Sequence, residues 1–163
     1  MPVPSGEILV ASVEDAPLLA RLHAACFEDA WSEQEFASLL GLPGTVALLE
    51  RGDSSSGDWR GFALLRHVAG EAEILTIGVL PACRGNRLAE ALLRAAVDLL
   101  IVQQVTELFI EVDELNQPAQ ALYRRFGFVE CGRRRGYYQH RDGSRSDALA
   151  MRIVLPSQSL ADR

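Results

Sequence analysis

One apolar segment followed by a glycine-containing turn constrains the fold of this chain more than any other feature. Residues 71–80 (EAEILTIGVL) are almost continuously apolar. A run of this kind is typical of a central strand that is buried on both faces of its sheet. The following stretch, 84–93 (RGNRLAEALL), opens a segment whose apolar positions repeat at the helical period. These residues therefore predict a buried strand, a tight turn and a long helix.

Two arginines occupy the expected first turn of that helix. The positive end of the helix dipole favours Asp or Glu at this place, so Arg84 and Arg87 require a negative partner. Exposed N–H groups at a helix start, together with nearby arginines, form an anion site, and a strand–turn–helix unit is suited to a pyrophosphate. The turn has neither the GK(S/T) of a Walker loop nor a GxGxxG fingerprint. A phosphate site of another type is predicted, and the alternative is two solvated arginines on a surface turn.

The remaining elements alternate and are joined by short connections. The expected strands are residues 7–12, 45–51, 59–67, 106–113, 127–138 and 146–155, and the further helices are residues 12–27, 32–40 and 116–126. Ser32 and Glu35 have the spacing of a capping box. The order β-α-α-β-β-β-α-β-α-β-β predicts an α/β (α+β) fold with a mixed, mostly antiparallel sheet and helices on both faces. The polar loop GDSSSGD (52–58) is expected to be disordered.

Composition limits the protein class. A chain of 163 residues that is 48% hydrophobic is expected to form one domain over residues 1–163. Its start lacks a basic region before an apolar run, and no apolar stretch approaches the ~18 residues of a membrane span, so a soluble, cytoplasmic protein without a membrane partner is expected. Three cysteines without CxxC spacing suggest neither a disulfide framework nor a metal site. The net charge of −6 argues against nonspecific binding to nucleic acid.

Two motifs resemble those of the GCN5-related N-acetyltransferases, the GNAT family. That family has an apolar strand ending in V-x-P, then R/Q-x-x-G-x-A/G and a helix, and VLPACRGNRLAEALL matches this pattern at Val79, Pro81, Arg84 and Ala89. Arg87 stands where the family has glycine. Downstream, IEVDELNQPAQALYRRFGF follows the family's E-V-x-x-x-N-x-x-A-x-x-L-Y-x-x-x-G-F.

Within that family the chain looks most like the RimI-type ribosomal-protein-alanine N-acetyltransferases. The similar features are FEDAWSEQEF near the start, Glu111 before Val112, and RRRGYYQHRDGSRSDALAM near the end. Asp113 departs from the arginine that commonly follows Glu-Val in the family. The resemblance spans about residues 7–155 and leaves a short C-terminal tail, residues 156–163.

The resemblance implies a GNAT fold and transfer of an acetyl group from acetyl-CoA to an amine, most specifically the N-terminal alanine α-amino group of a small-subunit ribosomal protein. Glu111 would accept the proton of the attacking amine, and Tyr123 would protonate the departing thiolate. Alternation along LFIEVD places Phe109, Glu111 and Asp113 on one face of their strand. The alternative interpretations are a solvated strand carboxylate and a tyrosine that only packs in the core.

The resemblance also implies contacts to acetyl-CoA and to the acceptor. The strand backbone would bind the acyl and pantetheine groups, the loop would hold the pyrophosphate, and Asn116 would cap its helix and help to place the pantetheine arm. The predicted cofactor contacts are Ile77, Gly78, Val79, Arg84, Gly85, Asn86, Arg87, Leu88, Ala89, Asn116 and Tyr123. Trp31, Tyr137 and Tyr138 would line the acceptor cleft.

Arg87 leaves two outcomes open. Either its guanidinium turns outward and adds a contact to phosphate, or it occupies the place of the ligand. Ordinary helical φ is expected in a first helical turn, arginine tolerates it, and a cation there is unfavourable without an anion, so binding of the phosphate is expected. Two other functions remain: a GNAT enzyme that acts on a small-molecule amine or on another protein N-terminus, and a non-catalytic acyl-CoA-binding or ribosome-associated protein, which obstruction of the loop by Arg87 would favour. The expected assembly is a monomer or a weak homodimer.

Overall fold

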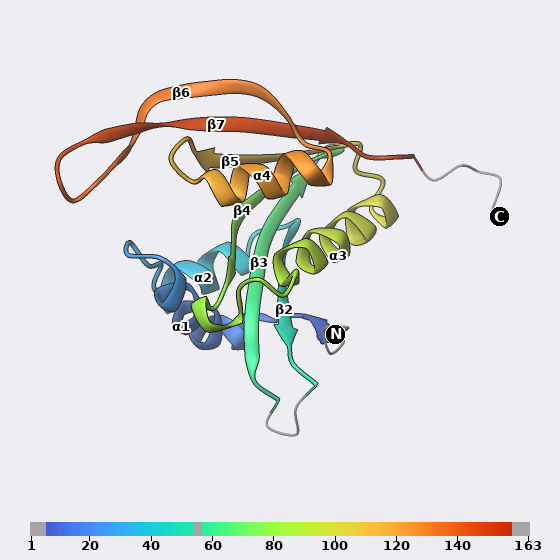
Figure 1. Ribbon diagram of the computed structural model, residues 1–163. Helices are drawn as coiled ribbons and strands as arrows, with labels where there is room; N and C mark the ends of the chain where they lie inside the picture. Colours follow the sequence, from blue (N-terminus) through green and yellow to red (C-terminus); the bar gives the residue numbers. More distant parts are fainter. Residues whose placement is uncertain (1–5, 54–56, 158–163) are drawn as a thin grey trace.

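The computed structural model describes residues 6–53 and 57–157. The loop 52–58, predicted to be disordered, includes residues 54–56, which lie outside the described residues. The elements, labelled in Figure 1, are β1 (Glu7–Val10), α1 (Ala16–Cys26), α2 (Glu33–Leu40), β2 (Thr45–Arg51), β3 (Trp59–Val68), β4 (Glu71–Val79), α3 (Leu88–Val102), β5 (Glu107–Asp113), α4 (Gln117–Phe126), β6 (Val129–Gln139) and β7 (Arg145–Val154), with short 3-10 helices η1 (Val13–Asp15) and η2 (Pro81–Cys83).

The described strands form one seven-stranded sheet in the order β1-β2-β3-β4-β5-β7-β6. The pair β4–β5 is parallel, and the other neighbouring strands are antiparallel. The predicted element order and the mostly antiparallel sheet are therefore confirmed. The parallel pair at the centre arises because α3 connects β4 to β5 and returns the chain to the same end of the sheet.

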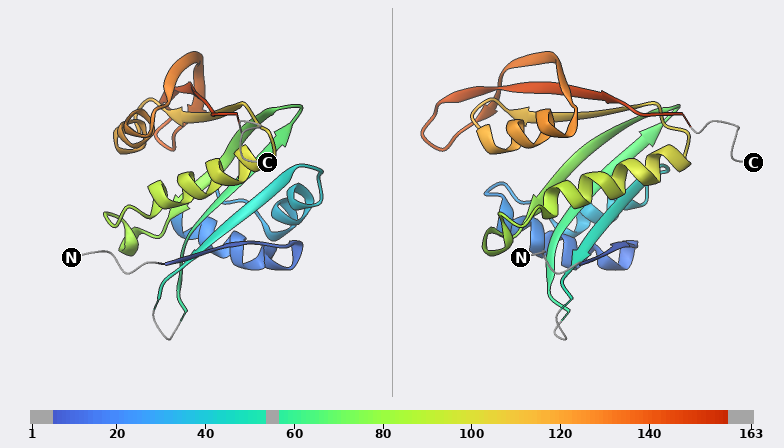
Figure 2. Two further views of the ribbon diagram at one scale, coloured as in Figure 1. Left: turned by 90° about the vertical axis from the view of Figure 1, so that its right-hand side faces the viewer. Right: turned by 45° about the vertical axis from the view of Figure 1, so that its right-hand side comes forward.

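Helices cover both faces of the sheet, as predicted. Figure 2 shows α3 on one face and the pair α1 and α2 on the other. Leu92, Leu93 and Leu100 of α3 pack with Leu108 of β5 in the larger core cluster. Leu19 and Leu22 of α1 and Phe36 of α2 pack in the smaller cluster against Phe62 and Leu64 of β3. The sheet is thus the shared wall between two apolar cores.

A β-bulge divides β4 into two halves. Leu64 and Leu65 of β3 pair with Thr76 and Ile74, so Leu75 is an extra residue on β4. A bulge reverses the alternation of side chains, and accordingly Ile74 and Ile77, three positions apart, both pack towards the α3 core. Parallel pairing with β5 extends only from Glu71 to Ile74 in the described strand. Beyond the bulge β4 and β5 diverge.

The structure corrects the burial predicted for this strand. β4 is central, but it is not buried on both faces: Glu71 and Glu73 are exposed, Ala72 and Ile74 are buried between and after them, and Val79 at its end is half-buried. Exposed and buried side chains alternate along Glu71–Ile74 because only the face of the sheet towards α3 is fully covered. The second half is partly open because β5 no longer lies beside it.

The predicted start of the long helix and the conformation of Arg87 were also wrong. Helix α3 begins at Leu88, so Arg84 and Arg87 lie in the loop before it, and Arg87 is the N-cap with φ of 57°. This left-handed conformation costs an L-residue free energy, and Gly85, at φ of 83°, adopts it more easily. Two left-handed residues within four positions turn the chain from η2 into α3, which explains why the family has glycine at this point.

The predicted helix caps at α2 and α4 are confirmed. The backbone N–H of Glu35 donates to Ser32 Oγ at 3.1 Å, and the backbone N–H of Ser32 donates to Glu35 Oε2 at 2.7 Å, which completes the capping box. Asn116 Oδ1 accepts the backbone N–H of Ala119 at 3.2 Å and caps α4.

A buried ion pair joins β2 to β3 at the end of the sheet near η2. Glu50 is only 1% exposed, and the guanidinium of Arg60 bonds both of its carboxylate oxygens, with Arg60 Nε 3.0 Å from Glu50 Oε2. A neighbouring pair, Arg51 with Glu7, is exposed. Removing one member of a buried pair leaves an uncompensated charge, whereas an exposed pair contributes little.

We therefore expect Arg60→Met to lower the free energy of unfolding by about 3 kcal/mol and Arg51→Met to lower it by less than about 1 kcal/mol. The double variant Glu50→Gln with Arg60→Met should recover most of the loss, because no buried charge remains. Urea unfolding followed by circular dichroism measures all three. Equal losses for the two single variants would contradict this ranking.

Candidate active site

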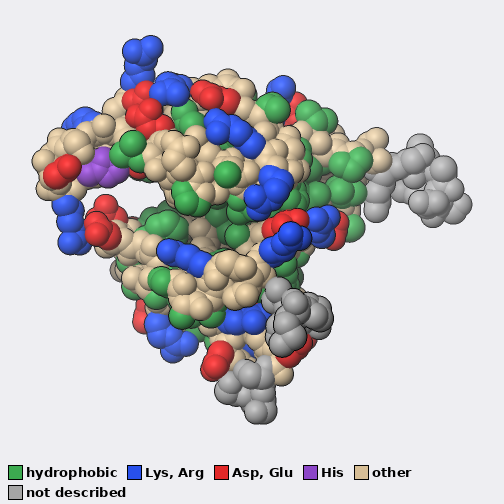
Figure 3. Space-filling view, in the orientation of Figure 1, with side chains coloured by type: hydrophobic (Ala, Val, Ile, Leu, Met, Phe, Trp, Pro, Cys, Tyr) green, Lys and Arg blue, Asp and Glu red, His purple; other side chains and the backbone are tan. Residues whose placement is uncertain are grey.

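A cavity of about 560 Å³ opens where β4 and β5 diverge. Its walls come from β4, β5, α4, the end of α1 and the β6–β7 hairpin. Six predicted site residues line it: Trp31, Ile77, Glu111, Asn116, Tyr123 and Tyr138. Figure 3 shows an opening through the molecule at this place, between the β6–β7 hairpin and the segment that joins α1 to α2. The structure thus brings together residues that lie more than a hundred positions apart.

Glu111 lies on β5 with its side chain facing the cavity. The alternation predicted along this strand is observed, because Leu108, Ile110 and Val112 are buried while Glu111 is partly exposed. Its Oε1 lies 3.0 Å from Nη2 of Arg134 on β6. The Glu111 carboxylate therefore lies at the edge of the cavity in an ion pair with Arg134, and it is not freely solvated.

Tyr123 on α4 is 5% exposed and belongs to the larger core cluster, with its ring edge-on to Phe128 at 5.8 Å. It also lines the cavity, so packing and a role in the site are compatible. Burial, followed by the neighbouring Tyr138, raises the pKa of Tyr123 to about 12. The phenol therefore keeps its proton at neutral pH and can act as a donor.

Two residues of this region were missed from the sequence. His23 of α1 is buried, stacks on Trp31 at 5.0 Å between ring centroids, and accepts the backbone N–H of Trp31 at Nδ1 over 3.1 Å. Burial lowers the pKa of His23 against the opposing effect of Glu35, so the neutral ring is favoured. Glu73 of β4 is exposed, but partial desolvation and then the nearby charge of Glu111 raise its pKa. The one signal in the sequence was that His23 follows Leu19 by four positions, which places both residues on the same face of their helix.

The two neighbouring tyrosines of β6 are placed differently. Tyr138 lines the cavity, and burial followed by Glu111 raises its pKa to about 12. Tyr137 is 54% exposed, is not among the described residues that line the cavity, and lies edge-on to Tyr138 at 5.1 Å. Arg134 and Tyr138 pair with Ala148 and Ser146, so they share one face of β6, and ordinary alternation places Tyr137 on the other.

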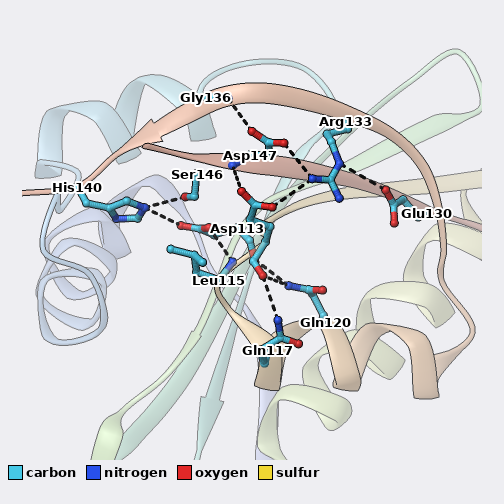
Figure 4. Close-up of polar contacts among 11 residues, drawn as sticks. Asp113, Leu115, Gln117, Gln120, Glu130, Arg133, Gly136, His140, Ser146 and Asp147 are labelled. Atoms are coloured by element: carbon cyan, nitrogen blue, oxygen red, sulfur yellow. Dashed lines mark hydrogen bonds and ion pairs between the residues drawn. The ribbon is translucent and has the colours of Figure 1, made fainter. Parts of the chain in front are cut away.

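Arg133 and two carboxylates hold the β6–β7 hairpin against the turn between β5 and α4 (Figure 4). Arg133 Nη1 lies 2.9 Å from Asp147 Oδ2 and 3.1 Å from Glu114 Oε2. Asp147 also accepts the backbone N–H of Gly136, and this bond, together with Arg133, holds the pKa of Asp147 below its ordinary value. Gln120 of α4 donates to the backbone carbonyl of Glu114 at 2.7 Å. The charge of Arg133 is thus neutralised by one carboxylate of β7 and one of the turn before α4.

The tip of the hairpin closes over the cavity. His140 Nε2 lies 2.7 Å from Ser146 Oγ and 3.6 Å from Asp113 Oδ2, as Figure 4 shows. Arg141 Nε lies 3.2 Å from Oε2 of Glu28, which follows α1, and both side chains are exposed. The tip of the hairpin and the segment after α1 therefore meet at one edge of the cavity.

The predicted phosphate loop lies next to the end of β4. Arg84 Nε donates to the carbonyl of Val79 at 3.2 Å, and Asn86 Nδ2 donates to the carbonyl of Cys83 at 3.1 Å. Arg87 forms no side-chain capping bond with the described residues, so the N–H groups of the first turn of α3 have no side-chain cap. The two following predicted contacts, Leu88 and Ala89, are buried and half-buried, so they offer backbone rather than side-chain contacts.

Gly78 has a packing reason to be glycine. A Cβ at this position would lie 2.7 Å from Cζ of Phe62 and 3.2 Å from Sγ of Cys26.

In the part of the chain that the structure describes, no three His, Cys, Asp or Glu residues are grouped to hold a metal ion. Among the described helices, none is long and apolar enough to cross a membrane.

Known proteins resemble this chain over nearly its full length. The model of the acetyltransferase (GNAT) family matches residues 16–128. The ribosomal protein bS18-alanine N-acetyltransferase of Escherichia coli (strain K12) is 35% identical over 148 residues, which cover 90% of this chain and 97% of that protein. The crystal structure of the ribosomal-protein-S18-alanine N-acetyltransferase from Escherichia coli has a TM-score of 0.86 at 30% identity and covers 96% of this chain and 97% of that one. Arabidopsis thaliana NAA60 in complex with acetyl-CoA shares the fold, with a TM-score of 0.78 at 18% identity over 92% of this chain and 98% of that one. The motifs, the divergence of β4 from β5 and these matches agree, and the chain belongs to the acetyltransferase (GNAT) family.

Proposed function

We propose that this protein transfers the acetyl group of acetyl-CoA to the α-amino group of an N-terminal alanine in a small-subunit ribosomal protein. The observation that carries this proposal is the meeting of Glu111 and Tyr123, one from β5 and one from α4, in a single cavity at the divergence of two strands. The Escherichia coli relative is named for alanine acetylation of ribosomal protein bS18, and it supports the choice of acceptor.

The residues present fit acetyl-CoA. Beyond Ile74, the described strand β4 is not paired with β5, and Leu75, Thr76 and Ile77 line the cavity. The backbone of Ile77 can therefore pair with the pantetheine arm, and that of Val79, further along the strand and outside the cavity lining, is proposed to continue this pairing towards the loop. The start of α3 offers N–H groups to the pyrophosphate, and a Cβ added at Gly85 would meet nothing within 4 Å among the described atoms, so the loop has open space on that side. When bound, acetyl-CoA supplies the acetyl group as a thioester.

Two side chains handle the protons in this proposal. Glu111 accepts the proton that the amine loses as its nitrogen forms a bond to the acetyl carbon. Tyr123 Oη gives its proton to the sulfur as the carbon–sulfur bond breaks, and its high pKa keeps that proton in place beforehand. Trp31 and Tyr138 line the same cavity and are proposed to bind the acceptor, while Asn116 is proposed to place the pantetheine arm.

The acceptor is tested directly by intact-mass measurement. Peptides of about ten residues that begin with alanine and follow small-subunit ribosomal sequences are incubated with acetyl-CoA and the protein, and each should gain one acetyl group. The same peptides with a blocked N-terminus and an internal lysine serve as the control and should gain none. If only lysine side chains or polyamines gain the acetyl group, the acceptor is a different amine.

Tyr123→Phe should reduce turnover by about 10²-fold or more with little change in acetyl-CoA affinity, because the ring remains and only the acid is lost. Stopped-flow or steady-state turnover and calorimetric titration measure the two quantities. A thermal melt close to that of the natural protein checks that the core is intact. Full activity of this variant would show that Tyr123 serves packing alone.

Arg87→Gly should increase stability by about 1 kcal/mol, because glycine adopts the left-handed conformation without the cost that arginine has. Its affinity for acetyl-CoA should change by less than about tenfold and depend less on salt, because one cation is lost. Gln104→Gly is the matched control: Gln104 follows the other end of α3 with φ of 62°, so the gain in stability should recur without any change in affinity.

Urea unfolding and calorimetry at two salt concentrations measure these effects. A natural protein that fails to bind acetyl-CoA, together with an Arg87→Gly variant that binds it well, would mean that the arginine obstructs the loop. The non-catalytic alternative would then be favoured.

A further inference from the structure

Arg134 is the partner of the carboxylate at the centre of the site, yet none of the motifs assigns it a role. Its Nη2 lies 3.0 Å from Glu111 Oε1, with side-chain exposures of 61% for Arg134 and 23% for Glu111. The guanidinium carbon also lies 5.3 Å from the centre of the Tyr137 ring. One cation therefore contacts both the predicted proton acceptor and an exposed aromatic ring outside the cavity.

The register of three strands explains how Arg134 reaches across the sheet. On β7, Ala150 lies opposite Glu111, and Ala148 lies opposite both Asp113 of β5 and Arg134 of β6. Residues directly opposite one another share a face of the sheet. Because the intervening β7 positions carry only methyl groups, a long side chain from β6 can pass over β7 to the carboxylate on β5.

The charges around Glu111 come from several elements. Glu73 faces it from β4, Tyr138 faces it from β6, and Asp113 follows it on β5. Two of these three groups are carboxylates, and Tyr138 is a neutral phenol at neutral pH. Arg134 thus balances a locally negative surface that would also attract the ammonium group of a protein N-terminus.

We propose that Arg134 is a displaceable counter-ion: it neutralises Glu111 until the α-ammonium group of the acceptor replaces it, while the guanidinium keeps its contact with Tyr137. This inference rests on the proposed function. A partly exposed ion pair contributes little free energy, so exchange of one cation for another is inexpensive. The acetylated product carries no ammonium group, so Arg134 can return to Glu111 and favour product release.

The proposal is tested by the binding of two peptides to the natural protein and three variants, by calorimetry in the presence of coenzyme A. One peptide begins with a free alanine, and the other is its N-acetylated form. Arg134→Gln should bind the free peptide about two- to fivefold more tightly, because no counter-ion has to leave, and should bind the acetylated peptide as the natural protein does. Arg134→Lys keeps the charge and should restore the natural affinity for the free peptide.

Arg135→Gln is the matched control. Arg135 is the next residue on β6, is exposed, and has Asp147 rather than Glu111 among its nearby charges. This variant should leave the affinity for both peptides unchanged. The contrast between the two peptides separates an effect on the ammonium group from a general loosening of the hairpin, which would move both affinities together.

Equal or weaker binding of the free peptide by Arg134→Gln overturns the proposal, as does a change that is the same for both peptides or a natural protein that binds neither. Acetyl transfer by the natural protein is measured separately by mass. Binding that follows the expected pattern without any transfer would contradict the proposed function and leave the exchange of counter-ions standing.

Discussion

One extra residue in the central strand determines where this protein can hold its substrates. The parallel pairing of β4 with β5 ends at the bulge at Leu75. The extra residue also shifts by one position which side chains of β4 face each side of the sheet. Both consequences are needed: the first opens the cavity, and the second keeps Ile77 and Val79 in the core on the α3 side while the strand edge faces the opening. An unbulged strand would continue the ladder and leave no cavity at this place.

The two neighbouring arginines of the hairpin illustrate how position in the sheet decides the effect of a charge. Arg133 bonds Glu114 and Asp147 and ties the hairpin to the turn before α4, so it contributes to the shape of the site. Arg134, one position on, faces the other side of β6 and reaches Glu111. The period of two along a strand separates these roles, although the residue types are the same.

Much of the fold could be predicted from local patterns. The capping box of Ser32 and Glu35, the Asn116 cap and the alternation along β5 each depend on residues within four positions of one another, and all are observed. The burial of β4 and the start of α3 could not be predicted in this way. Glu73 is exposed because the surrounding helices leave its face uncovered, and Arg87 is left-handed because the chain must turn from η2 into α3.

The sequence by itself determined the family, the order of the elements and the motif positions of Glu111 and Tyr123, because spacing along the chain carries that information directly. Only the tertiary structure decided that Tyr138 lines the cavity while Tyr137 lies outside it, that His23 stacks on Trp31, and that Glu111 is paired with Arg134. These outcomes depend on contacts between segments that are far apart in sequence, and on a bulge between Glu130 and Gly132 that shifts the side chains of β6 by one position. A pattern of residue types does not record such shifts, since each is set by the packing of the whole sheet.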